Sequence, residues 1–105
     1  MLRYFFVLTV CFFCSSANAV QWIKAKVTGI EVTYMPGSLR FSLDAGNTAC
    51  PAGTQMVWQN PSADNNKVIH STVLAAMLAG KKLNIVINDN DTTCVVRYVY
   101  ILNES

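Results

Sequence analysis

The sequence has little of what nucleic-acid binding requires. Only 13% of its 105 residues are charged, with eight Lys and Arg against six Asp and Glu. A protein that tracks a phosphate backbone needs a marked basic excess on one surface. We therefore expect no nucleic-acid partner.

Catalytic motifs are also absent. There is no Gly-x-Ser-x-Gly, His-Glu-x-x-His or phosphate-binding loop, and His70 is the one histidine. General acid–base chemistry needs a partner held beside His70, whose neighbours are apolar, so a packed or solvent-edge position is favoured. Two carboxylates on one wall, Asp44 with Asp89 or Asp91, leave a glycosidase as an alternative, although their separation is open. We predict that the protein is not an enzyme and has no cofactor.

Metal-binding patterns are incomplete. Asn88–Asp91 offers oxygen ligands but lacks the distal glutamate of a calcium loop, so a hairpin turn is favoured. Two cysteines and His70 do not make a zinc cluster. We expect no metal site.

The N terminus carries the main apolar run, which is too short to cross a bilayer as a helix. It extends from Tyr4 to Phe13 after the basic Arg3, and small residues follow it up to Ala19. This pattern predicts a signal peptide over residues 1–19 with cleavage after Ala19. The mature domain, residues 20–105, should be secreted or periplasmic.

A lipoprotein anchored through Cys11 or Cys14 is the alternative export signal. The residues before these cysteines, Val10 and Phe13, are bulky for such a signal, which makes it the less favoured reading. No later stretch is long enough to span a membrane, so we expect no membrane span.

Only Cys50 and Cys94 remain after cleavage at Ala19. An exported chain of this length has a limited core and usually needs a covalent link. Two cysteines in an oxidising compartment allow one intramolecular pairing. We predict a Cys50–Cys94 disulfide.

The first half of the mature chain has the period of β-strands. Apolar residues alternate from Trp22, and the phase changes at Gly29, which predicts a long first strand reaching Tyr34 with a bulge at the glycine. A turn at 35–38 leads to a second strand at 39–43. A loop at 45–54 precedes a short third strand at 56–58.

The second half contains one helix. Asp64 is the expected N-cap and Gly80 the left-handed C-terminal residue of a helix over 64–79. The apolar spacing predicts burial of Val68, Ile69, Thr72, Val73, Ala76 and Met77. Strands at 83–87 and 94–102 follow, separated by a turn at 88–91. The order β-β-β-α-β-β in a mainly β chain predicts an OB-fold, a five-stranded Greek-key barrel.

The aromatic residues admit two interpretations. We expect most of Trp22, Tyr34, Phe41, Trp58, Tyr98 and Tyr100 to fill the barrel. Any that prove exposed would be platforms for stacking a sugar or base, and the balanced charge favours the sugar.

The segment from Phe41 to Cys94 resembles small exported bacterial proteins related to the pentameric B subunits of pertussis-like and typhoid-like toxins. The resemblance is carried by Phe41–Asp44, Cys50 with Trp58 after it, the helix from Lys67 to Lys82, and Cys94 with Tyr98. It implies an OB-fold that forms rings, binds a host or surface glycan and associates with a toxin A subunit.

Two hypotheses about function follow. The first is a non-catalytic glycan-binding module that uses the outer surface of the first three strands near Tyr34, Arg40, Asp44 and Gln59. The second is a periplasmic or secreted structural or interaction protein without sugar binding. A patch of exposed aromatic and amide side chains on the wall of the barrel would favour the first.

Overall fold

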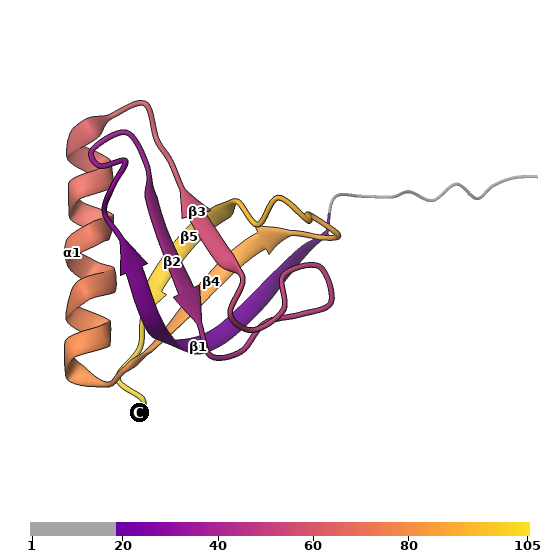
Figure 1. Cartoon of the computed structure of the whole chain (residues 1–105). Coiled ribbons are helices and arrows are strands. Elements are labelled where there is room, and N and C mark those ends of the chain that lie inside the picture. The colour runs from indigo at the N-terminus through magenta and orange to yellow at the C-terminus, as the bar shows by residue number, and fades with distance from the viewer. Residues whose placement is uncertain (1–18) are drawn as a thin grey trace, which may run out of the picture.

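A computed structural model describes residues 19–105 (Figure 1). The predicted signal peptide lies outside these residues, apart from Ala19. The elements are β1 (Val20–Glu31), β2 (Leu39–Leu43), β3 (Gln55–Trp58), α1 (Ala63–Ala79), β4 (Lys82–Asn88) and β5 (Val96–Ile101). The predicted class, mainly β with one helix after the third strand, is confirmed.

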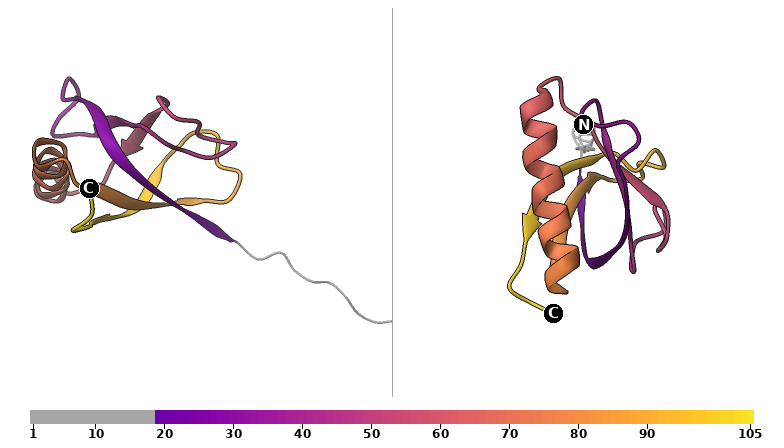
Figure 2. Two further views of the ribbon diagram at one scale, coloured as in Figure 1. Left: turned by 90° about the horizontal axis from the view of Figure 1, so that it is seen from below. Right: turned by 60° about the vertical axis from the view of Figure 1, so that its left-hand side comes forward.

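The five strands form one sheet in the order β3-β2-β1-β4-β5, and neighbouring strands are antiparallel. The sheet curls until its two outer strands meet. There Val57 and Val95 form a parallel bridge, in which the Val57 amide donates to the Cys94 carbonyl at 3.0 Å. Figure 2 shows the strands wrapped around a common interior with α1 on one side.

The first strand is long enough to serve two partners. Residues 20–26 pair with β4, and residues from Val27 to Glu31 pair with β2. The register with β2 shifts between Val27 and Gly29, which confirms the predicted bulge. A Cβ on Gly29 would lie 3.3 Å from the Ser42 hydroxyl, so glycine lets the two strands approach closely at the bend.

The core lies between the inner face of the sheet and α1. Alternate residues of the strands point inward and are nearly inaccessible to solvent, and α1 adds Val73 and Ala76. The largest of these buried side chains are Phe41, Leu39, Met56, Leu83, Ile85 and Ile87.

The start of α1 differs from the prediction. Ser62, not Asp64, is the N-cap: its backbone is extended and its hydroxyl accepts from the Asn65 amide at 3.2 Å. Asp64 lies within the first turn, where a carboxylate is favourable near the positive end of the helix dipole. Gly80 ends the helix at φ 68°, as predicted.

The buried face of α1 is partly different from the predicted one. Val73 and Ala76 are fully buried, and Ile69 and Met77 partly, but Val68 is exposed. Asn66, which is fully buried, lies on the same side of the helix as Val73 and Ala76 and leaves Val68 on the other side. Its amide nitrogen donates to the carbonyls of Pro36 (2.7 Å), Gly37 (3.1 Å) and Asn60 (3.0 Å).

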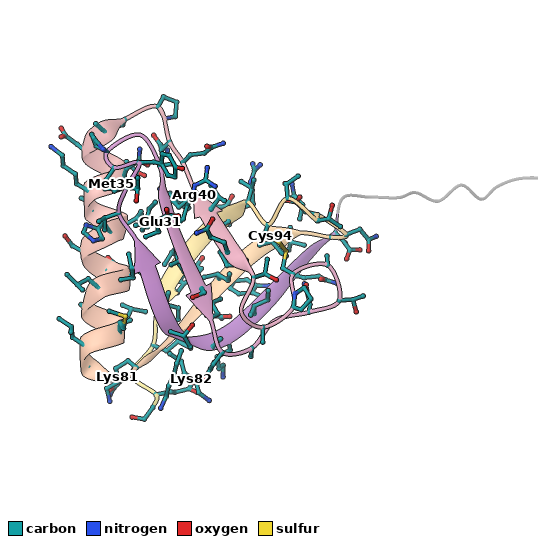
Figure 3. The ribbon with its side chains drawn as sticks, in the orientation of Figure 1. Glu31, Met35, Arg40, Lys81, Lys82 and Cys94 are labelled. Carbon is teal, nitrogen blue, oxygen red and sulfur yellow. A yellow bond between two sulfur atoms is a disulfide. The ribbon has the colours of Figure 1, made fainter. Side chains whose placement is uncertain are left out.

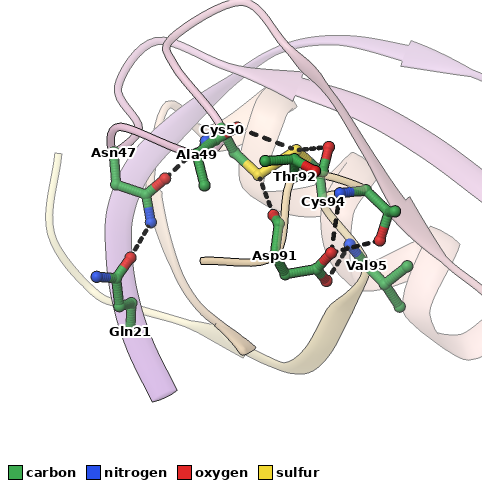
Figure 4. The surroundings of a disulfide bond; sticks show 9 residues. Gln21, Asn47, Ala49, Cys50, Asp91, Thr92, Cys94 and Val95 are labelled. Atoms are coloured by element: carbon green, nitrogen blue, oxygen red, sulfur yellow. Dashed lines mark hydrogen bonds between the residues drawn. A yellow bond between two sulfur atoms is a disulfide. The ribbon is translucent and has the colours of Figure 1, made fainter. Parts of the chain in front are cut away.

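The predicted disulfide is present. Cys50 and Cys94 are bonded, with their Cα atoms 5.9 Å apart, and the bond joins the loop after β2 to the segment before β5 (Figure 4). Two predicted strands were too long. β1 ends at Glu31 because a turn closes between Val32 and Gly37. β5 begins at Val96 because Cys94, at φ 58°, is not extended.

Among residues 19–105, no helix combines the length and the apolar character that crossing a membrane would require.

Candidate ligand-binding surfaces

Two of the four predicted site residues are in contact. The Arg40 guanidinium carbon, on β2, lies 4.9 Å from the ring centroid of Tyr34, in the turn after β1. This is cation–π geometry, and it covers one face of an otherwise exposed ring. Arg40 also stands opposite Glu31 in the pairing of β1 with β2 (Figure 3).

The other two predicted residues lie apart from this pair. Asp44 follows the far end of β2, about 13 Å along the strand from Arg40. Its carboxylate accepts from the Lys26 amide at 2.9 Å, so it is engaged in holding β1 to β2. Gln59 follows β3 at the Arg40 end of the sheet, beside a hollow that Asn60 and Arg97 also line.

A hollow of about 290 Å³ lies on the outer surface of β1 and β2 next to Arg40. Glycines at 29 and 53 leave it open, and Glu31, Ser42 and Gln55 supply its polar groups. The Gln55 amide donates to the Glu31 carboxylate at 2.7 Å. Alternation in the sequence already places Ser42 outward with Arg40, whereas Glu31 and Gln55 were not predicted as site residues.

The clearest exposed feature is an aromatic face on the other half of the sheet, formed by Trp22, Tyr98 and Tyr100. These side chains are 56%, 58% and 49% exposed. Trp22 comes from β1 and the two tyrosines from β5, with β4 between them. The Trp22 and Tyr100 ring centroids are 5.6 Å apart, with 35° between the ring planes.

The aromatic face has a buried floor and a polar border. Val86 lies between Trp22 and Tyr98 in the strand pairing, and is 1% exposed although it lies outside the core cluster. We infer that the rings cover it. Asn84, between Lys24 and Tyr100, brings a half-buried amide to the same side of the sheet.

The exposure of these rings corrects the expectation that most aromatics fill the interior. Phe41 is buried and Trp58 partly so, but Tyr34 and the three residues of the aromatic face are exposed. The signal was present in the alternation of β1, where Trp22 has the same parity as the exposed Lys24. The alternation of a strand determines which side of the sheet a residue faces, and the hydrophobicity of the residue alone does not.

Two of the three carboxylates weighed as catalytic groups, those of Asp44 and Asp91, have structural contacts. The pKa of Asp91 is lowered, first by the Thr93 hydroxyl and further by backbone amides including that of Val95, against a smaller opposing effect of burial. These bonds close the turn before Cys94 (Figure 4). Within the part of the chain described by the structure, no three His, Cys, Asp or Glu side chains form a group that could hold a metal ion.

Comparison with known proteins found no matching family model, no matching curated protein and no matching solved structure. Function is therefore inferred from the surfaces of this chain.

Proposed function

We propose that this protein is an exported, non-catalytic glycan-binding module built on an OB-fold. The observation that carries the proposal is the aromatic face, where Trp22 and Tyr100 lie side by side in solvent next to the Asn84 amide. The order of the strands supports the OB-fold assignment, as does the bridge between Val57 of β3 and Val95, which directly precedes β5.

The chemistry of the face suits a sugar. A pyranose has an apolar C–H surface, which packs on an aromatic ring, and a rim of hydroxyls, which needs donors and acceptors. Trp22 and Tyr100 offer the ring surface, while Asn84 and the Tyr98 and Tyr100 hydroxyls offer hydrogen bonds at its edges. The Lys24 ammonium lies at the same border and pairs with the Glu104 carboxylate at 3.3 Å.

The surface near Tyr34, Arg40 and Gln59 remains the second candidate for the sugar site. There the hollow on β1 and β2 offers Glu31, Ser42 and Gln55 to hydroxyl groups. We favour the aromatic face, because Arg40 already covers one side of Tyr34 and Asp44 is bonded to the Lys26 amide.

The relationship to pentameric toxin B subunits, with a ring of subunits and an A subunit as partners, belongs to the same proposal. One exposed sugar site is shallow and binds weakly, so useful binding would come from several sites presented together.

A glycan array probed with the purified protein tests the proposal. Trp22→Ala and Tyr100→Ala should each lower the signal of any glycan bound by the parent at least about fivefold, taking the scale of about 1–3 kcal/mol that one aromatic ring contributes when a base stacks on it. Tyr34→Ala is the matched control, as it removes an exposed ring from the other half of the sheet, and should leave the signal unchanged.

The reverse pattern, loss with Tyr34→Ala and Arg40→Ala but not with Trp22→Ala, would move the site to the Arg40 surface. An array without any signal would contradict sugar binding. It would favour the alternative function, an interaction module whose exposed Trp and Tyr side chains contact a protein partner, since these residues dominate such contacts.

A further inference from the structure

The sheet is open beside the point where its two outer strands meet. In the sheet, β3 pairs with β2 and β5 pairs with β4, each on one side only. Within residues 19–105, the Val57–Val95 bridge is the one backbone pairing between the two outer strands. Beyond this bridge, the two parallel edges face each other without a strand partner. Such edges offer amide and carbonyl groups to an extended chain placed between them.

A hollow of about 260 Å³ occupies this opening. Three consecutive residues of the chain line it from each side: Trp58, Gln59 and Asn60 on one side, and Val95, Val96 and Arg97 on the other. Both runs begin at or directly after the bridge, so the hollow lies between the two edges where they separate. Three residues of a strand span about 7 Å, which is the length of two residues in an extended peptide.

Arg97 reaches the hollow because β5 has a bulge at this residue. Tyr98 pairs with Val86 and Val96 pairs with Ile87, which leaves Arg97 as an extra residue on β5. A bulge interrupts the regular alternation of a strand and gives the extra side chain a new direction. Val96 is accordingly buried in the core, whereas Arg97 is exposed and lines the hollow.

The hollow presents positive charge and hydrogen-bond donors. No Asp or Glu lines it, and Arg97 has no ion-pair partner among residues 19–105. The nearest acidic residue along the chain is Asp91, whose carboxylate accepts from backbone amides of its own turn. Asn60 is a further donor, because its side-chain oxygen accepts from the Ser62 amide at 2.9 Å and its nitrogen is left for a ligand. These groups suit a carboxylate.

We propose that this hollow binds an extended peptide segment of a protein partner, and that the segment carries an acidic side chain. The peptide backbone pairs with the edges of β3 and β5, and its carboxylate binds the Arg97 guanidinium. Addition of a strand to a sheet edge is a common mode of peptide recognition, in which the backbone supplies affinity and side chains supply specificity. A sugar acid would satisfy Arg97 but would leave the strand edges unpaired.

This site goes beyond the proposed sugar binding, because none of its lining residues belongs to the aromatic face of Trp22, Tyr98 and Tyr100. Two residues of an extended chain make a small contact, so we expect weak binding, with a Kd of about 1 mM for a short peptide.

An NMR titration of the isotope-labelled mature protein with the peptide acetyl-Thr-Val-Glu-Val-Thr-amide tests the proposal. The backbone amides of residues 58–60 and 95–97 should shift and saturate. The same peptide with Lys in place of Glu should bind at least tenfold more weakly, because its charge repels that of Arg97. Replacing both valines of the peptide with proline should weaken binding at least tenfold, because proline removes the amide donors that pair with a strand edge.

Arg97→Ala should weaken binding of the Glu peptide at least tenfold and remove the preference for Glu over Lys. Lys81→Ala is the matched control, since it removes a positive charge after the far end of α1 and should leave binding as in the parent (Figure 3). The shifted amides locate this site without the glycan array, so either proposal can fail while the other stands.

Three results would overturn the proposal: no saturable shift with the Glu peptide up to about 10 mM, equal binding of the Lys peptide, or shifts confined to the aromatic face. Glucuronate that shifts the amides of residues 95–97 in the parent but not in Arg97→Ala, with no binding of the Glu peptide, would assign the hollow to an acidic sugar and overturn the peptide.

Discussion

At the scale of single residues, Asn66 is a polar side chain that is fully buried. Its amide nitrogen serves three backbone carbonyls, one on the β3–α1 connection and two on the turn between β1 and β2. Its side-chain oxygen is buried without a partner among residues 19–105. Asn66 therefore links α1 to the turn between β1 and β2 only through hydrogen bonds that its side chain donates.

Asn66→Asp should destabilise the fold by at least about 3 kcal/mol, because a buried carboxylate oxygen would face carbonyl oxygens and lose the donated bonds. Urea denaturation measures the loss. Asn65→Asp is the matched control: Asn65 accepts from the Trp58 indole at 3.0 Å, and aspartate keeps that acceptor. Equal losses in the two variants would contradict the role assigned to the Asn66 amide.

Asp91 should make the protein less stable in acid. A carboxylate whose folded-state pKa is lowered stabilises the fold above its unfolded pKa of about 3.9, and this stabilisation is lost as the pH falls through the folded pKa. Asp91→Asn should lower stability at pH 7 and flatten its decline below about pH 4, measured by urea denaturation at several pH values. Asp89→Asn, in the same turn, should leave that decline as it is in the parent. An unchanged decline in Asp91→Asn would show that this carboxylate does not carry the effect.

At the scale of elements, one side of α1 is buried in the core and the other side is exposed to solvent. Val73 is fully buried, whereas Val68 is mostly exposed on the same helix. Apolar spacing alone assigned both to the core. Asn66, Val73 and Ala76 share the buried side of α1, which leaves Val68 on the opposite side.

Val73→Asp should prevent stable folding, because it places an unpaired charge against the core. Val68→Asp makes the same chemical change on the exposed side, and should cost less than about 1 kcal/mol, measured by thermal denaturation at low protein concentration. Similar melting temperatures for the two variants would contradict the placement of Val73 in the core and of Val68 in solvent.

At the scale of the whole molecule, the disulfide joins two loops that are far apart in the sequence. Cys50 lies in the loop after β2, and Cys94 follows the turn that Asp91 closes (Figure 4). The Asn47 side chain adds a second constraint, since its nitrogen donates to the side-chain oxygen of Gln21 on β1 and its oxygen accepts from the Cys50 backbone amide at 2.7 Å. This region lies next to the Val57–Val95 bridge, where the two outer strands of the sheet meet.

Replacing both cysteines with alanine should lower the free energy of unfolding by about 3–4 kcal/mol, because the bond closes a loop of 44 residues in the unfolded chain. Equilibrium urea denaturation of the double variant, compared with the parent, measures this loss. A difference below about 1 kcal/mol would show that the bond does little to restrict the unfolded chain.

The sequence by itself determined the features that depend on local chemistry. Alternation, the glycine at the phase change, and Gly80 as a left-handed residue predicted the order of the elements and the bulge, because each depends on nearby residues, but they did not predict where β1 ends or where β5 and α1 begin. The pairing of Cys50 with Cys94 followed from their number once the N-terminal cysteines were assigned to the signal peptide.

The tertiary structure alone decided the surfaces. Trp22 and Tyr100 are far apart in the chain, and only the placement of β4 between β1 and β5 gathers them into one face. No local pattern predicts the burial of Asn66, because the Pro36 carbonyl that it bonds lies 30 residues earlier in the chain. Contacts between distant segments override local preference because each buried polar group must find its partner wherever the fold provides one.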